Sequence, residues 1–281
     1  MATFTNRATL TFNGGSTNSN TVTGEILEVL SATKTALSET YRVGDRVTYV
    51  VTLVNTGSVA LTNLTFTDSL GAYVFEGETL YPLTYQNAVY YQNGVLQPTP
   101  TVNPGPPLTV TGITVPAGGN VTLVYEALIN EFASPLAGGT VENTLTVTGG
   151  GLAAPITVTE EITAEEASAL TIGKSVCPPV VTDNGELTYT FVIQNSGNTE
   201  AVATDNLVLT DLFDPILNPI TVTYNGAPWT EGVNYTYDPT TGAFSTLPGQ
   251  ITVPAATFEQ NPDGTWTVTP GTSVVTVTGT V

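Results

Sequence analysis

The 281-residue chain has 5 basic residues against 24 acidic ones, which gives a formal net charge of −19. Such acidity repels phosphate backbones and anionic membrane surfaces, so nucleic acid is not an expected partner. The sequence has no histidine, one cysteine and no phosphate-binding glycine loop after a strand. Because no recognisable catalytic or metal-binding set remains, we expect no enzyme activity, no metal and no cofactor.

The chain is rich in threonine and valine and carries 27 glycines and 19 prolines. β-branched residues favour strands, and closely spaced Gly and Pro favour turns, so we predict an all-β protein. The length suits two domains. No stretch approaches the roughly 18 apolar residues that span a bilayer. The N-terminus lacks the hydrophobic core of a secretory signal, so either the signal has been removed or export follows another route.

The first predicted element is a hairpin, with two alternating strands around a Gly-rich turn between Phe4 and Ile26. Side chains at period two share one face of a strand. The residues predicted to form a donor strand are Asn6, Ala8, Leu10 and Phe12 on the first strand, and Val22 and Ile26 on the second. Of these, Ala8, Leu10 and Phe12 are expected to fill pockets of a partner.

An internal duplication follows the hairpin. Lys34 stands fifteen residues before Tyr49, and Lys174 stands fifteen residues before Tyr189. Each tyrosine is followed six residues later by the Asn of an Asn-x-Gly turn. Further along the chain, Phe66-Thr67-Asp68 in the first repeat corresponds to Leu209-Thr210-Asp211 in the second. Each repeat contains about seven to nine short strands with turn signals between them, which is typical of an antiparallel β-sandwich.

Several further strands are predicted from alternation and flanking turns. They are Leu64–Thr67, Ala88–Gln92, Leu108–Val115 and Val121–Ile129 in the first repeat, and Leu207–Thr210, Ile220–Tyr224, Thr265–Thr269 and Ser273–Val281 in the second. The acidic run Glu160–Ala169 is predicted to be a solvated linker rather than a helix.

The two repeats end differently. After its last long strand the first repeat runs on into a second hairpin, from Glu142 to Thr163, whereas the second repeat stops at Val281. The N-terminal hairpin has the same pattern of strand, Gly-rich turn and strand as this second hairpin, and Asn6 occupies the position equivalent to Asn143. We therefore expect the second repeat to be incomplete, with its missing piece at the N-terminus of another chain.

Both repeats resemble a bacterial surface-protein repeat family, domain of unknown function 11. The resemblance rests on the ordered Lys, Thr-Tyr, Asn-x-Gly and Thr-Asp positions. It implies immunoglobulin-like sandwiches that close with a strand similar to Glu142–Thr148, and so assigns that strand to the first repeat. The predicted organisation is a donor hairpin at 1–27, a first sandwich at 28–163, a linker at 164–169 and an incomplete second sandwich at 170–281.

An incomplete sandwich exposes unpaired backbone groups and an apolar groove, and a strand from a neighbour repairs both. We therefore predict a homopolymer that assembles head to tail by N-terminal strand donation. One alternative is a permuted monomer, in which residues 1–26 complete the first repeat and residues 140–163 complete the second.

The two lysines predict a second property. Lys34 and Lys174 are the only lysines and occupy equivalent positions. A buried lysine amine beside a carboxylic acid can condense with the side-chain amide of an asparagine to form an isopeptide bond, with loss of ammonia. The candidate sets are Lys34, Asp68 and Asn143 within one chain, and Lys174, Asp211 and the Asn6 of a neighbour. The competing interpretations are an ancestral lysine retained through duplication, and a charged edge residue that blocks misassociation.

The remaining residues predict little chemistry. Cys177 is expected to be a small packed residue, and the acidic group Asp205, Asp211 and Asp214 to be a solvated turn cluster rather than a calcium site. Trp229 and Trp266 are expected to be packed rather than to form a ligand platform.

The sequence therefore predicts a subunit of an extracellular filament on a cell or spore surface, with itself as partner. The alternative is a monomeric surface adhesin or spacer that binds a carbohydrate or protein of a host or matrix surface. It would bind through the insertions of the second repeat.

Overall fold

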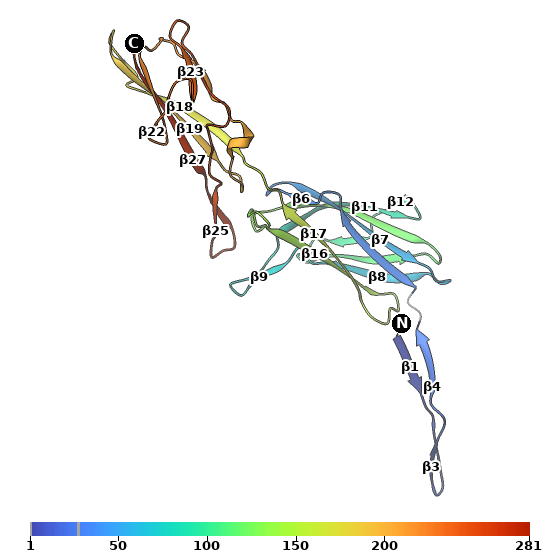
Figure 1. Ribbon diagram of the computed structural model, residues 1–281. Helices are drawn as coiled ribbons and strands as arrows, with labels where there is room; N and C mark the ends of the chain where they lie inside the picture. Colours follow the sequence, from blue (N-terminus) through green and yellow to red (C-terminus); the bar gives the residue numbers. More distant parts are fainter. Residues whose placement is uncertain (1, 27–28) are drawn as a thin grey trace. The chain divides into compact units, whose positions relative to one another are not determined.

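A computed structural model describes residues 2–26 and 29–281, and the regular secondary structure of these residues is almost entirely antiparallel strand (Figure 1). Its contacts divide the chain into two units, one formed by Met1–Ser134 and Thr140–Thr163, the other by Pro135–Gly139 and Ala164–Val281. Each unit contains a sandwich of the immunoglobulin-like class. The predicted fold class is therefore confirmed.

The first domain packs a five-stranded sheet against a six-stranded sheet. In spatial order the five strands are β12 (Val95–Gln97), β11 (Leu83–Gln92), β15 (Asn120–Ile129), β7 (Arg46–Asn55) and β5 (Leu30–Ala36). The six are β13 (Thr101–Asn103), β14 (Leu108–Val115), β8 (Leu61–Asp68), β16 (Thr140–Gly149), β17 (Ile156–Ala164) and β6 (Thr40–Tyr41). A small ribbon of β9 (Tyr73–Phe75) and β10 (Glu78–Leu80) lies between β8 and β11 in the sequence.

The core of this domain follows from the period-two pattern of its strands. On β7 the residues Val47, Tyr49, Val51 and Leu53 are all buried, and the residues between them are more exposed. β15 alternates in the same way along its whole length. Because both central strands present one apolar face, they fix which side chains meet between the sheets.

β16 closes the first domain from within its own repeat. It pairs with β8 through Leu145 opposite Asp68 and Val147 opposite Phe66, and with β17 on its other edge. The hairpin at 142–163 thus belongs to the repeat that precedes it, and the permuted-monomer alternative is wrong. The acidic run also differs from prediction. β17 extends to Ala164, because the pairing with β16 continues through Glu160 and Glu161.

The second domain packs a five-stranded sheet against a three-stranded one. The five are β18 (Leu170–Cys177), β19 (Glu186–Asn195), β27 (Gly271–Thr280), β21 (Ile220–Tyr224) and β22 (Ala227–Pro228). The three are β20 (Thr210–Leu212), β24 (Ala243–Thr246) and β23 (Tyr235–Asp238). A ribbon of β25 (Thr257–Gln260) and β26 (Trp266–Thr269) and a short 3₁₀ turn, η1 (Ala203–Asp205), complete it.

The strand predicted at Leu207–Thr210 is instead β20 at Thr210–Leu212. Its counterpart β8 has a partner strand on each edge, β14 and β16. β20 pairs only with β24 among the described residues. A backbone that has partners on one edge alone forms less of the regular ladder that defines a strand. The segment before β20 therefore has no regular strand structure, although the sequence pattern predicts a strand there.

The N-terminal hairpin consists of two ribbons in succession. β1 (Ala2–Asn6) pairs with β4 (Val22–Ile26), and β2 (Thr9–Phe12) pairs with β3 (Gly15–Asn18) (Figure 1). Phe4, Leu10, Phe12 and Val22 each expose more than half of their surface. A lone hairpin with exposed apolar residues is marginally stable in water, which favours capture by another surface.

Candidate functional site

A buried lysine lies between the sheets of the first domain. Lys34 on β5 donates a hydrogen bond from Nζ to Asp68 Oδ2 at 2.7 Å. The two side chains are 0% and 1% exposed, and the ammonium lies 4.9 Å from the centre of the Tyr49 ring. A charge pair buried so completely is costly unless further hydrogen bonds satisfy it.

Those further bonds come from Asn143 and Tyr125. Lys34 Nζ also donates to the main-chain oxygen of Asn143 at 2.9 Å. The Tyr125 hydroxyl donates to Asp68 Oδ2 at 2.6 Å, and the side-chain amide of Asn143 donates to that hydroxyl at 3.0 Å. The lysine, acid and asparagine selected from sequence spacing therefore lie in one hydrogen-bonded network. Tyr125 links the acid to the asparagine carboxamide.

Sequence reasoning did not identify Tyr125. It faces Tyr49 directly across the β7–β15 pairing, and the two rings stack at 5.3 Å. Nothing in the duplication marked it, because the second domain has no tyrosine there. In that domain Tyr189 pairs with Val277, and Phe213 supplies the stacked ring at 5.0 Å.

The electrostatics of the first site follow from burial. Loss of water lowers the pKa of Lys34, although the nearby Asp68 carboxylate acts in the opposite direction. Burial raises the pKa of Tyr125 well above its usual range, and the Asp68 charge adds to this effect. The tyrosine therefore stays protonated as a donor, and the neutral, nucleophilic form of the lysine is favoured relative to a lysine in water.

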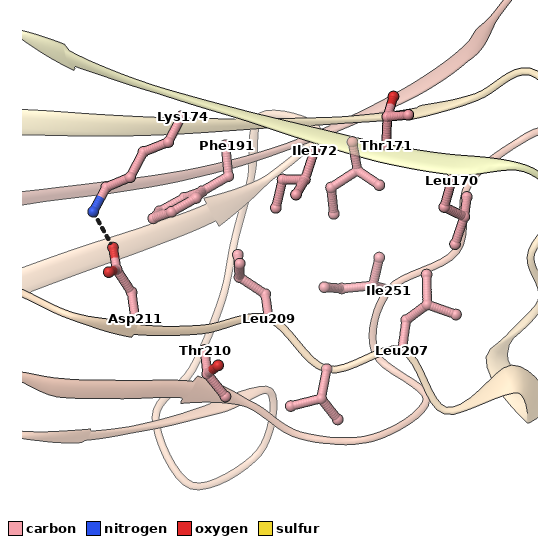
Figure 2. A pocket seen from close by; sticks show the side chains of 12 residues that line it. Leu170, Thr171, Ile172, Lys174, Phe191, Leu207, Leu209, Thr210, Asp211 and Ile251 are labelled. Atoms are coloured by element: carbon pink, nitrogen blue, oxygen red, sulfur yellow. Dashed lines mark hydrogen bonds and ion pairs between the residues drawn. The ribbon is translucent and has the colours of Figure 1, made fainter.

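The second domain holds the equivalent lysine and acid in a more open setting. Lys174 on β18 forms an ion pair with Asp211 on β20 (Figure 2). Their side chains are 41% and 17% exposed. The Lys174 ammonium lies 4.4 Å from the centre of the Tyr189 ring, as Lys34 lies over Tyr49. The two sites thus share lysine, acid and aromatic ring, and differ in their access to water.

An apolar groove of about 480 Å³ opens beside Lys174 and Asp211. Figure 2 shows its walls, β18 and β19 on one side and the segment leading into β20 on the other. The apolar side chains that line it are Leu170, Ile172, Phe191, Ile193, Leu207, Val208, Leu209 and Ile251. Leu170 is the equivalent of Leu30 in the duplication, since each stands four residues before its lysine. Leu30 is 7% exposed, whereas Leu170 is 39% exposed. The groove is therefore a stretch of core that lacks its cover in the described chain.

The groove occupies the place that β16 fills in the first domain. β16 lies along β8 on the edge away from β14, and covers Lys34 and Asp68. In the second domain the described residues place no strand on the corresponding edge of β20. Asn6, the predicted third member of the Lys174 set, lies on β1, where it is exposed and pairs with Val22.

The predicted donor residues are distributed over the hairpin as follows. Leu10 and Phe12 lie on β2, Ala8 lies in the break before it, and all three are exposed. Val22 is exposed at the start of β4. Ile26 ends β4, and its side chain lies outside the described part of the chain.

Cys177, expected to be packed, is exposed, so that prediction is wrong. It ends β18, whose residues are all exposed because the facing sheet does not reach over them. No disulfide constrains it.

The acidic cluster and the tryptophans have structural contacts. Asp205 accepts from the backbone of Val202, and Asp211 is bound to Lys174. Within the described residues no group of three or more potential metal ligands occurs. Trp229 stacks on Tyr224 at 5.0 Å and packs against the core of the second domain. Trp266 is half-buried, so neither tryptophan forms an open platform.

No helix among the described residues is long and apolar enough to cross a membrane. No family model and no curated protein matches the sequence. The resemblance to the surface-protein repeat family therefore stays a prediction.

The solved structures that overlap the chain do so with TM-scores below 0.5. The chain overlaps the major pilin subunit BcpA of Bacillus cereus over 96% of its own length and 73% of that chain, with 10% identity and a TM-score of 0.35. It overlaps a 35 kDa C-terminal fragment of the major pilin GBS80 of Streptococcus agalactiae over 86% of each chain, with 11% identity and a TM-score of 0.35. A family 123 glycoside hydrolase from Clostridium perfringens matches 49% of this chain, 14% identical with a TM-score of 0.34, and only 27% of the hydrolase is covered.

Proposed function

We propose that the protein is the structural subunit of an extracellular filament, in which each copy donates its N-terminal hairpin to the second domain of a neighbour. The observation that carries this proposal is the groove beside β20. It lies where β16 closes the first domain, and the hairpin has the sequence plan of β16 and β17. Strand addition of this kind combines main-chain hydrogen bonds with side chains that fill pockets.

The β16–β8 register defines how the donated strand would sit. In the first domain Leu145 lies opposite Asp68, and Val147 lies opposite Phe66. With Asn6 in the place of Asn143, Ala8 takes the place of Leu145, and Leu10 takes the place of Val147. Both positions in the first domain are almost fully buried, at 1% and 0% exposure.

The same register aligns the donor with the apolar wall of the groove. Ala8 would face Asp211, Leu10 would face Leu209, and Phe12 would face Leu207. Leu10 and Phe12 are 65% and 57% exposed in the hairpin. Burial of a side chain such as Leu10 contributes about 1.5–3 kcal/mol, which is a substantial part of a stable contact.

Donor and acceptor are different surfaces of the chain, so the contact is heterologous. A heterologous contact propagates as a ring or as an open filament. We propose the open filament, on a cell or spore surface, with other copies of this chain as the partner. An adhesin that binds through the tryptophan insertions has weaker support, because Trp229 is stacked and packed.

Removal of the hairpin tests strand donation. A chain shortened to begin at Leu27 is expected to form no filaments by negative-stain microscopy and light scattering, while its first domain keeps its cooperative unfolding transition. A synthetic peptide of residues 1–26 is expected to block elongation of the full chain by filling free grooves. Filaments from the shortened chain would contradict the proposal.

We also propose that Lys34 and Asn143 form an isopeptide within the first domain. The neutral amine of Lys34 attacks the side-chain carboxamide carbon of Asn143 and forms the new C–N bond. A proton passes through Asp68 and the Tyr125 hydroxyl to the amide nitrogen, which leaves as ammonia. The support is the network that joins these four groups, with Asp68 2.7 Å from the amine and Tyr125 3.0 Å from the amide nitrogen.

Intact mass under denaturing conditions tests this bond. The full chain is expected to weigh less than its sequence mass by one ammonia, and Lys34→Arg is expected to restore the full mass. A full mass for the unaltered chain would refute the bond, and would leave strand donation unaffected.

A further inference from the structure

The second domain contains two of the three reacting groups that the first domain brings together. Lys174 and Asp211 are paired, and the aromatic ring of Tyr189 lies beneath the lysine as Tyr49 does beneath Lys34. In the first domain the third group, Asn143, arrives on the closing strand β16. The second domain has a groove there, so its reaction site is incomplete until a strand enters.

The donor hairpin carries an asparagine at the matching position. Asn6 stands two residues before Ala8 and four before Leu10, as Asn143 stands two before Leu145 and four before Val147. Side chains two and four residues apart share one face of a strand. When the donated segment runs as one continuous strand through Arg7 and Ala8, where the free hairpin has a break between β1 and β2, the register that seats Ala8 and Leu10 in the groove also turns Asn6 towards Lys174 and Asp211.

We propose that strand donation creates a covalent bond between subunits, in which Lys174 of one copy condenses with Asn6 of the next. This inference rests on the proposed function, since the asparagine reaches the lysine only on a donated strand. It assigns to Lys174 and Asp211 a modification site that a single copy cannot complete.

The reaction needs no oxidant and no cofactor. The Lys174–Asp211 ion pair becomes an amine and a carboxylic acid by transfer of one proton between the two residues. The amine attacks the carboxamide carbon of Asn6 while the acid polarises the carboxamide oxygen. A C–N bond forms to Lys174 and the bond to the amide nitrogen breaks; the proton that the amine loses passes through Asp211 to that nitrogen, which leaves as ammonia.

Seating of the donor strand controls when this reaction starts. In the single copy 41% of the Lys174 side chain is exposed to water. Covering the groove would bring it towards the environment of Lys34, whose side chain is fully buried. Burial favours the neutral amine, so the reaction starts once the donated strand is seated in the groove.

The second site differs from the first in one respect that affects its rate. Tyr189 pairs with Val277, so no hydroxyl occupies the place of Tyr125 as a proton relay. Asp211 must then both polarise the carboxamide oxygen and transfer a proton to the leaving nitrogen. We expect bonds between subunits to form after the filaments and more slowly than the bond within the first domain.

The test uses the full chain and follows two readouts over time, filaments by negative-stain microscopy and size by denaturing electrophoresis under reducing conditions. The expected result is a ladder of multimers that grows after filaments appear. Mass spectrometry of the digested ladder is expected to join the Lys174 and Asn6 peptides with loss of one ammonia. The reductant is needed because exposed Cys177 can form disulfides between copies.

Three substitutions sharpen the test. Lys174→Arg keeps the positive charge without a nucleophilic amine, and Asn6→Ala removes the carboxamide, so each is expected to abolish the ladder. Asn20→Ala is the matched control, because Asn20 lies between β3 and β4 of the same hairpin and outside every strand. It is expected to leave the ladder intact.

The outcomes separate this inference from the proposed function. Filaments of the unaltered chain that dissociate fully to monomers in hot detergent would overturn the covalent bond and keep strand donation. A ladder that persists in Lys174→Arg would likewise overturn it. Absence of filaments from the unaltered chain would instead refute strand donation, on which the bond depends.

Discussion

Truncation of Leu10 to alanine is expected to weaken assembly without weakening the subunit. Leu10 is 65% exposed in the hairpin of the single copy. In the filament it would occupy the position of Val147, which is 0% exposed. Loss of a buried leucine side chain costs about 2–5 kcal/mol, so the lower figure raises the dissociation constant of the subunit contact about 30-fold.

The critical concentration of the filament reports this constant. It is best measured by light scattering and pelleting in chains that also carry Lys174→Arg, so that a covalent bond cannot hide dissociation. Denaturant unfolding of Leu10→Ala at concentrations below assembly is expected to match the parent chain within about 0.5 kcal/mol. The matched control is Val59→Ala, which truncates a side chain that is 72% exposed in the first domain.

An unchanged critical concentration for Leu10→Ala would refute the reasoning, because it would mean that Leu10 does not enter the groove. A large loss of monomer stability would refute it in another way. It would show that the hairpin packs against its own chain.

Three further predictions concern the first domain and the net charge. Tyr125→Phe keeps the stacked ring and removes the proton relay; intact-mass time courses should show slower loss of ammonia, and an unchanged rate would exclude the relay. Burial raises the pKa of Tyr41 from 10.0 to about 12 and also raises those of Tyr49 and Tyr125. Folding stability present below pH 10 should therefore fall as pH rises to 12, by about 2–3 kcal/mol from Tyr41 alone; unfolding curves that do not change over this range would contradict these burial effects. The charge of −19 makes subunits repel, so raising ionic strength from about 0.01 M to about 0.15 M should lower the critical concentration; a rise would show that attraction between opposite charges dominates the contact.

Local patterns in the sequence predict the class of fold and the equivalence of the two repeats. Alternation at period two fixes which face of a strand is buried, and that information is local, so β7 and its counterpart β19 were recognisable from residues alone. The equal spacing of Lys34 and Lys174 from their tyrosines also identified the two lysines as equivalent positions of the duplication.

The surroundings of those lysines and the open edge of β20 follow instead from contacts between distant segments. Tyr125 enters the Lys34 site because β15 pairs with β7 in one register, a contact between distant segments that no local pattern encodes. The segment before β20 is irregular because β20 has a partner strand on one edge only, and Cys177 is exposed because the sheet that faces β18 has three strands instead of six. Exposure depends on neighbours that arrive from elsewhere in the chain or from another copy, so a residue's own sequence context cannot specify it.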